Sequence, residues 1–325
     1  MTGRDVTEAW TATPDPARVR HSGAAAGELP RRALAKIILV MLLWALCFPL
    51  ITVGLSRVSP LYFAAARALL AGVALLLLAT ALRRPRPAGP GIWAALLAIG
   101  LTATSLGFLG MFLAGQFVAP GFATVIANTQ PLVAAVLAAW FLGETLGRRE
   151  KAALLLGFAG VVTMTLPRLV GGGDVADAAG IAYVLAAAIG VAAGNILMKR
   201  MAGRVDPLMA MGFQLVLGGL PLMLAALGFE PAPRTFRTPE MMAVLAALAL
   251  AGTALPFYLW FSLLQRSSLS RANTFSFLTP VFGLAIGVGL FGEQLGWPEL
   301  AGIGLVLVGI WQIGRSRDHA RGSGL

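Results

Sequence analysis

The sequence predicts an all-α integral membrane protein with ten transmembrane helices, arranged as two inverted five-helix repeats. Three observations lead to this prediction. The composition is apolar, an internal repeat places Pro131 and Pro280 in equivalent positions 149 residues apart, and Lys and Arg gather in alternate loops. Inverted membrane repeats of this kind commonly enclose a shared site halfway through the bilayer.

The composition excludes a water-soluble globule. Hydrophobic residues make up 58% of the 325 residues, charged residues only 12%, and the mean hydropathy is +0.82. This leaves too little polar surface to cover a folded protein in water. The net charge of +11 comes from short clusters of Lys and Arg between apolar runs. We interpret the clusters as topology signals, and we expect a lipid bilayer and no nucleic acid as the partner.

Charges, Pro and Gly divide the chain into ten apolar segments, most of which reach the ~20 residues that a helix needs to cross a bilayer. The first repeat, 33–167, contains segments 33–55, 60–82, 91–117, 119–142 and 149–167. The second repeat, 178–314, contains segments 178–201, 207–228, 240–265, 270–292 and 297–314. Residues 1–32 lack apolar periodicity and are expected to form a disordered cytoplasmic tail, and residues 315–325 a second cytoplasmic tail.

The internal repeat runs without a gap through the later part of each half. Matches of Ala or Leu would mean little in so apolar a chain, but the matching residues are of rarer types. At an offset of 149 they are Gln116 and Gln265, Phe108 and Phe257, Gly143-Glu144 and Gly292-Glu293, Glu150 and Glu299, and Gly160 and Gly309. We therefore expect two copies of one structural unit.

The basic residues lie mostly on one side of the ten segments. Assigned to alternate loops, twenty Lys and Arg fall on one side and four on the other, while Arg67 lies inside the second segment. Cytoplasmic loops are enriched in Lys and Arg, so both termini are expected in the cytoplasm of a bacterial inner membrane. Because five spans is an odd number, the second half enters the membrane from the opposite face, which makes the repeats inverted.

Several short motifs occur in order along the chain. They are Trp44-Ala45, Ser59-Pro60 followed by Arg67, Asn128-Thr129-Gln130-Pro131 through Gly143-Glu144, and Phe277-Leu278-Thr279-Pro280 through Gly292-Glu293. Over about residues 33–314 this pattern resembles the ten-helix, EamA-type branch of the drug/metabolite transporter superfamily. The resemblance implies secondary transport of small metabolites or amino acids, usually export across the inner membrane. One departure is Ala192-Ala193-Gly194-Asn195, which lacks the tryptophan of the first-half motif.

Pro131 and Pro280 fall near the middle of their segments, and we expect the substrate site there. Proline removes one backbone hydrogen bond and displaces the carbonyl four residues earlier, which here belongs to Ala127 or Ser276. A carbonyl freed at this depth has to face protein or a water-filled cavity. The alternative is a kink that serves packing alone.

Uncharged polar and aromatic side chains are candidates to line the same cavity. They are Asn128 and Asn273 on the proline-bearing segments, Gln116, Tyr258 and Gln265 on the segments before these, and Trp44 and Asn195 on the first helix of each half. The alternative for each polar side chain is a hydrogen bond between helices, which is the commoner role in membranes.

Three charged residues are also candidates. Arg67 could snorkel to the lipid headgroups, bind a substrate carboxylate, or anchor the backbone of a neighbouring helix. Glu144 and Glu293 are candidate gating residues that would pair with Arg148, Arg149 or an opposing loop. The alternative for both is a carboxylate that stabilises the start of the next helix.

Missing features narrow the function. All fourteen acidic residues lie in tails, loops or segment ends, so the spans offer no carboxylate for a proton relay. The sequence contains no G-x-x-x-x-G-K-[ST], H-E-x-x-H or G-x-S-x-G motif. We therefore expect neither an ATP-driven pump nor an enzyme, and no cofactor or metal. We expect a monomeric secondary transporter of a small molecule; the alternatives are an exchanger of phosphorylated or nucleotide-linked sugars and a non-transporting scaffold or sensor.

Overall fold

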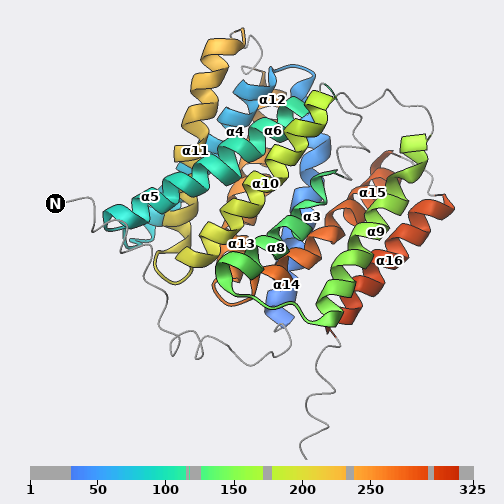
Figure 1. The fold of residues 1–325 in the computed structure, drawn as a ribbon. Helices are drawn as coiled ribbons and strands as arrows, with labels where there is room; N and C mark the ends of the chain where they lie inside the picture. Colours follow the sequence, from blue (N-terminus) through green and yellow to red (C-terminus); the bar gives the residue numbers. More distant parts are fainter. Residues whose placement is uncertain are drawn as a thin grey trace, which may run out of the picture.

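The computed structural model describes residues 31–114, 117, 126–170, 178–231, 238–291 and 296–314. These residues form helices and connecting turns, with no strand among them (Figure 1). Among the helices of these described residues, six are long and apolar enough to cross a membrane, which confirms an all-α membrane protein. The other expected spans correspond to shorter or partly described helices, so the number of ten stays a prediction. Gln116 and Glu293 lie outside the described residues.

The described helices follow the predicted order. The first half contains α3 (Arg31–Leu55), α4 (Pro60–Ala81), α5 (Pro90–Ile99), η1 (Gly100–Leu106), α6 (Gly107–Ala114), α8 (Gln130–Leu142) and α9 (Arg148–Val170). The second half contains α10 (Ala178–Met201), α11 (Pro207–Phe229), α12 (Pro239–Ala249), η2 (Leu250–Ala254), α13 (Leu255–Leu264), α14 (Leu269–Thr274), η3 (Phe275–Phe277), α15 (Leu278–Phe291) and α16 (Trp297–Gly314).

Equivalent helices of the two halves cross at glycines, and the crossings are duplicated. On α4 and α11, a Cβ added to Gly72 would lie 2.8 Å from Val216, and one added to Gly219 would lie 3.0 Å from Leu69. Gly72 and Gly219 are 147 residues apart, and so are Leu69 and Val216. The two contacts are therefore the same contact made twice.

The helices α9 and α16, side by side in Figure 1, show the same duplication at an offset of 149. A Cβ on Gly160 would lie 2.6 Å from the Gly302 carbonyl oxygen, and one on Gly309 would lie 2.9 Å from the Ala153 carbonyl oxygen. Glycine is needed at these points because any side chain would separate the two backbones.

The equivalent helices run antiparallel. As the contact positions on α4 rise from Leu69 to Leu76, their partners on α11 fall from Gly219 to Gly212. Antiparallel packing of equivalent helices through duplicated contacts is what a twofold axis in the membrane plane produces. The second repeat is therefore inverted relative to the first, as the loop charges predicted.

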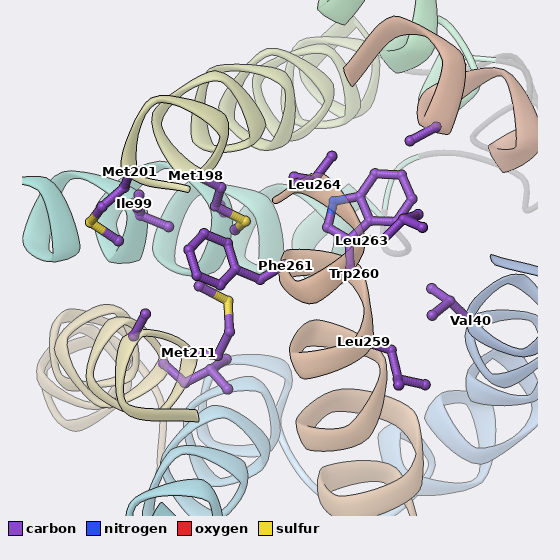
Figure 2. Close-up of a cluster of buried hydrophobic side chains, with 14 of the residues drawn as sticks. Val40, Ile99, Met198, Met201, Met211, Leu259, Trp260, Phe261, Leu263 and Leu264 are labelled. Atoms are coloured by element: carbon purple, nitrogen blue, oxygen red, sulfur yellow. The ribbon is translucent and has the colours of Figure 1, made fainter. Parts of the chain in front are cut away.

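Two π-helical segments, η1 and η2, also occupy equivalent positions, since Leu101 and Leu250 are 149 residues apart. A π-helical turn holds an extra residue and is frequent at functional sites. Around η2 and α13 lies the main apolar core, where Phe261 is fully buried between Met198 of α10 and Met211 of α11 (Figure 2).

Replacing Gly302 with alanine is expected to destabilise the crossing of α9 and α16 by about 1–3 kcal/mol. The added Cβ would lie 2.5 Å from the Gly160 carbonyl oxygen, a backbone atom that cannot move aside. Gly304 lies on the same helix with open space around its Cα, so Gly304→Ala is the matched control. Thermal unfolding in detergent measures both; equal unfolding temperatures for the two variants would contradict the close crossing.

Candidate functional site

The helix that carries Pro280 changes character where the sequence places the site. Leu269–Thr274 is α-helical, Phe275–Phe277 is a 3-10 turn, and the α-helix resumes at Leu278. Pro280 is the third residue of the resumed helix and has no N–H to donate back to the Ser276 carbonyl. The 3-10 turn thus ends three residues before the proline and contains Ser276, the residue whose carbonyl Pro280 is expected to displace.

Pro131 has a similar place, because Ile126 and Ala127 before it are also helical. It is the second residue of α8, and Asn128 and Thr129 form a turn before it. Proline suits a helix start because the first N–H groups have no partner within the helix. Pro131 therefore follows a two-residue turn that separates helical residues 126–127 from α8, and its place in the middle of a membrane span stays a prediction.

Asn273 is the least satisfied polar side chain of the described core. It is 1% exposed, yet neither its Oδ1 nor its Nδ2 has a hydrogen-bond partner among the described residues. Gln130, at the start of α8, has a buried Nε2 in the same condition, and α8 packs against α14. Buried amides without partners are costly, so such groups are candidates to bind a ligand.

Two other sequence candidates, Trp44 and Asn195, meet at one tryptophan. The Asn195 Oδ1 atom accepts a hydrogen bond of 2.9 Å from the Trp260 indole nitrogen. The Trp44 ring lies 5.6 Å from the ring of Trp260 and 6.4 Å from that of Phe257. Helices α3, α10 and α13 are thereby joined, which is the interhelical role left open for Asn195.

Arg67 points into the protein, so the snorkelling alternative is wrong. Its side chain is 6% exposed, and its Nε atom donates to Thr253 Oγ1 at 2.6 Å. Its Nη2 atom donates to the Gly252 carbonyl oxygen at 3.3 Å, and the guanidinium lies 4.8 Å above the Phe108 ring. Arg67 therefore anchors α4 to the π-helical segment η2.

The other half has the same anchor with a neutral side chain. Thr104 Oγ1 donates to Gln214 Oε1 at 2.8 Å. Thr104 and Thr253 are 149 residues apart, and Arg67 and Gln214 are 147 apart, so the two bonds are equivalent. Sequence reasoning missed both threonines, although their spacing at the repeat period was a usable signal.

Glu144 reaches across to the other repeat. Its Oε1 accepts from the Leu269 backbone N–H at 2.9 Å, and its Oε2 accepts from the Ser270 N–H and hydroxyl at 3.0 and 2.8 Å. Glu144 thus caps the start of α14. The start of its own next helix is capped by Glu150, whose Oε2 accepts from Gly147 N at 2.9 Å.

Two cations hold the same connection between α13 and α14, and the sequence analysis assigned neither a role. The Lys199 ammonium donates to the carbonyl oxygens of Leu264 and Ser267 at 2.7 and 2.6 Å. Arg271 forms an ion pair of 3.4 Å with Glu150. Together with Glu144 these contacts form what we call the α13–α14 clamp, at the membrane face predicted to be cytoplasmic.

The remaining candidates are less well placed. Tyr258 and Gln265 are half-buried, and Gln265 follows the last residue of α13, away from the helix middle. Asn128 is half-buried in the turn before α8. The structure therefore brings Trp44 and Asn195 together at Trp260, places Asn273 at the helix interruption, and puts Glu144 in the clamp.

The sequence of the chain matches a known protein family. The model of the EamA-like transporter family matches residues 31–166 and 178–315, one match for each repeat. The chain belongs to the EamA-like transporter family. This EamA-family protein is accordingly a multi-pass membrane protein and a transporter.

Individual relatives agree with this assignment. The EamA-family chain is 31% identical to a probable amino-acid metabolite efflux pump of Salmonella typhimurium, over 84% of this chain and 92% of the relative. It is 29% identical to an uncharacterized transporter of Synechocystis, over 83% and 86% of the two chains. A protein crystal structure matches with a TM-score of 0.74 at 21% identity, covering 87% and 96%; at this identity it supports the fold alone.

Proposed function

We propose that this EamA-family protein is a secondary transporter that exports small metabolites, such as amino acids, across the bacterial inner membrane, with both termini in the cytoplasm. Transport would proceed by alternating access, in which the two inverted repeats open one site to each face in turn. The name of the Salmonella relative supports the metabolite class. The duplicated antiparallel crossings support an exchange between two mirrored states.

The observation that carries the proposal is the amide of Asn273, which lies beside the helix interruption and has no hydrogen-bond partner within the described ranges of the chain. A carboxamide offers donors on nitrogen and acceptor positions on oxygen, so it suits a ligand with both kinds of group. The ammonium and carboxylate of an amino acid have this character. The freed backbone before Pro280 would supply a further acceptor at the same depth.

The charges of the interior favour a substrate without net charge. Arg67 is the one charged side chain that the sequence places well inside a span, and it is occupied by Thr253 and Gly252. A phosphorylated or nucleotide-linked sugar would need free cations at its binding site. Arg67 is not free to act as one, which argues against the exchanger alternative.

Replacing Asn273 with leucine should abolish transport and leave the protein as stable as the wild type or more stable. Removing two buried polar atoms that lack partners relieves about 1–3 kcal/mol, whereas a substrate that bonds to them loses those contacts. The measurement is uptake into inside-out vesicles of radiolabelled compounds identified by metabolite profiling of cells with and without the protein, together with thermal unfolding.

Thr274 provides the control for this variant. It is 1% exposed on the same helix, and its hydroxyl is satisfied by the Ser270 carbonyl oxygen at 3.1 Å. Thr274→Val should leave transport within about twofold of the wild type. Full transport by a correctly folded Asn273→Leu protein would place the substrate site elsewhere.

A further inference from the structure

A hollow on the membrane face predicted to be cytoplasmic is lined by none of the residues proposed for the substrate site. It lies between the connection from α4 to α5 and the connection from α10 to α11. Its lining consists of Pro85, Arg86, Pro87, Ala88 and Ile92 from the first, and Gly203, Arg204, Val205 and Asp206 from the second. The two connections come from different repeats and are not equivalent positions of the repeat. The fold brings them together.

The charge around the hollow is strongly positive. Arg83, Arg84, Arg86 and Arg204 are all exposed. The one acidic lining residue, Asp206, lies 3.9 Å from the Arg84 Nε atom, and its Oδ1 accepts from the N–H groups of Leu208 and Met209 at 2.9 and 3.3 Å. Within the described part of the chain, Arg83, Arg86 and Arg204 have no acidic partner.

At the opposite face of the membrane, the equivalent position carries an acidic residue in place of an arginine. There Glu230 occupies the position equivalent to Arg83, since the two are 147 residues apart. Its carboxylate accepts from the N–H groups of Leu61 and Tyr62 at 2.9 and 3.0 Å, which caps the start of α4. On the face with the hollow, the start of α11 is capped by Asp206, the residue directly before it. Arg83 occupies the position that Glu230 occupies in the other half.

Trp93 indicates the level of the bilayer at which the hollow lies. This residue lies in the first turn of α5, directly after Ile92 of the lining, and is 38% exposed. Its ring packs edge-on against Phe213 at 4.7 Å. Half-exposed tryptophans are typical of the headgroup level of a bilayer, where the ring meets both apolar and polar surroundings.

We propose that this hollow binds the phosphate of an anionic phospholipid headgroup. Arg86 and Arg204 face it from the two connections and supply charge-assisted donors to the phosphate oxygens. The acyl chains lie along α5 and α11 beside Trp93 and Phe213. The site is independent of the substrate site and of the transport proposal.

The test is a binding titration of the full-length protein in an uncharged detergent, followed by native mass spectrometry. The probes are dioctanoyl phosphatidylglycerol, dioctanoyl phosphatidylcholine and inorganic phosphate. Phosphatidylglycerol is expected to bind the wild type in preference to phosphatidylcholine. The double variant Arg86→Gln/Arg204→Gln should bind it about thirtyfold more weakly, since each arginine near the headgroups contributes roughly fivefold.

Two further variants make the result specific. Arg32→Gln/Arg148→Gln removes the same charge from exposed positions on the same predicted face outside the hollow, and should bind as the wild type does. Arg86→Lys/Arg204→Lys keeps the charge, should retain most of the binding, and serves if the glutamine variant unfolds. Equal loss in the Arg32/Arg148 control, equal binding of phosphatidylcholine, or inorganic phosphate that displaces the lipid at equal concentration would each overturn the proposal.

Discussion

Replacing Glu144 with alanine is expected to weaken the α13–α14 clamp by about 2–3 kcal/mol, because the N–H groups of Leu269 and Ser270 lose a carboxylate that caps them. If the clamp closes the cytoplasmic face, this shifts the balance toward the open state by roughly thirtyfold or more. The measurement is the labelling rate of Thr274→Cys, buried behind the clamp, by a membrane-impermeant maleimide in a Cys47→Ala background.

Two variants calibrate the Glu144 result. Glu144→Gln keeps one acceptor oxygen and should fall between the wild type and Glu144→Ala. Glu240→Ala breaks an ion pair of 2.9 Å with Arg57 at the opposite face, where both side chains are well exposed, so labelling should change little. A labelling rate that does not change in Glu144→Ala would mean that the clamp does not limit access.

Replacing Arg67 with alanine is expected to lower the free energy of unfolding by about 3 kcal/mol, through a cavity in the core and lost hydrogen bonds to Thr253 and Gly252. Arg67→Gln should retain the stability of the wild type, because the equivalent Gln214 already makes the same anchor to Thr104 without a charge. Thermal unfolding in detergent compares the three proteins.

Transport by the Arg67→Gln protein separates two roles of the side chain. If Arg67 is only an anchor, transport should stay within about twofold of the wild type. Loss of transport in a stably folded Arg67→Gln protein would show that the charge itself serves the substrate. Instability equal to that of Arg67→Ala would contradict the equivalence of the two anchors.

The repeat made much of this fold predictable, because it constrains distant positions together. The repeat period links Pro131 with Pro280, and the alternation of basic loops indicates five spans, an odd number, in each half. Together they imply inverted halves, and the glycine crossings agree. The direction of Arg67 was not predictable in the same way. Helix α4 is apolar on every side, so its sequence does not show which face turns inward.

The partner of Glu144 was also beyond the sequence. Because Glu144 follows Gly143 at the end of α8, proximity in the sequence predicts that it caps the next helix, α9. In the structure Glu150 caps α9. Glu144 instead reaches Leu269 and Ser270, which only the packing of α8 against α14 brings within range. Contacts between repeats depend on the rotation of whole helices, and local sequence does not encode it.

The duplicated anchors have a consequence for how the protein can change shape. In a transporter whose two repeats exchange conformations, a hydrogen bond that is also made at the equivalent position of the other repeat is preserved by the exchange. A hydrogen bond that is made in one copy only must be broken. Arg67 with Thr253 and Gln214 with Thr104 are such a pair. If the two repeats exchange conformations as proposed, the Arg67 guanidinium stays hydrogen-bonded in both states, and a transported solute meets the same electrostatic surroundings at either face of the membrane.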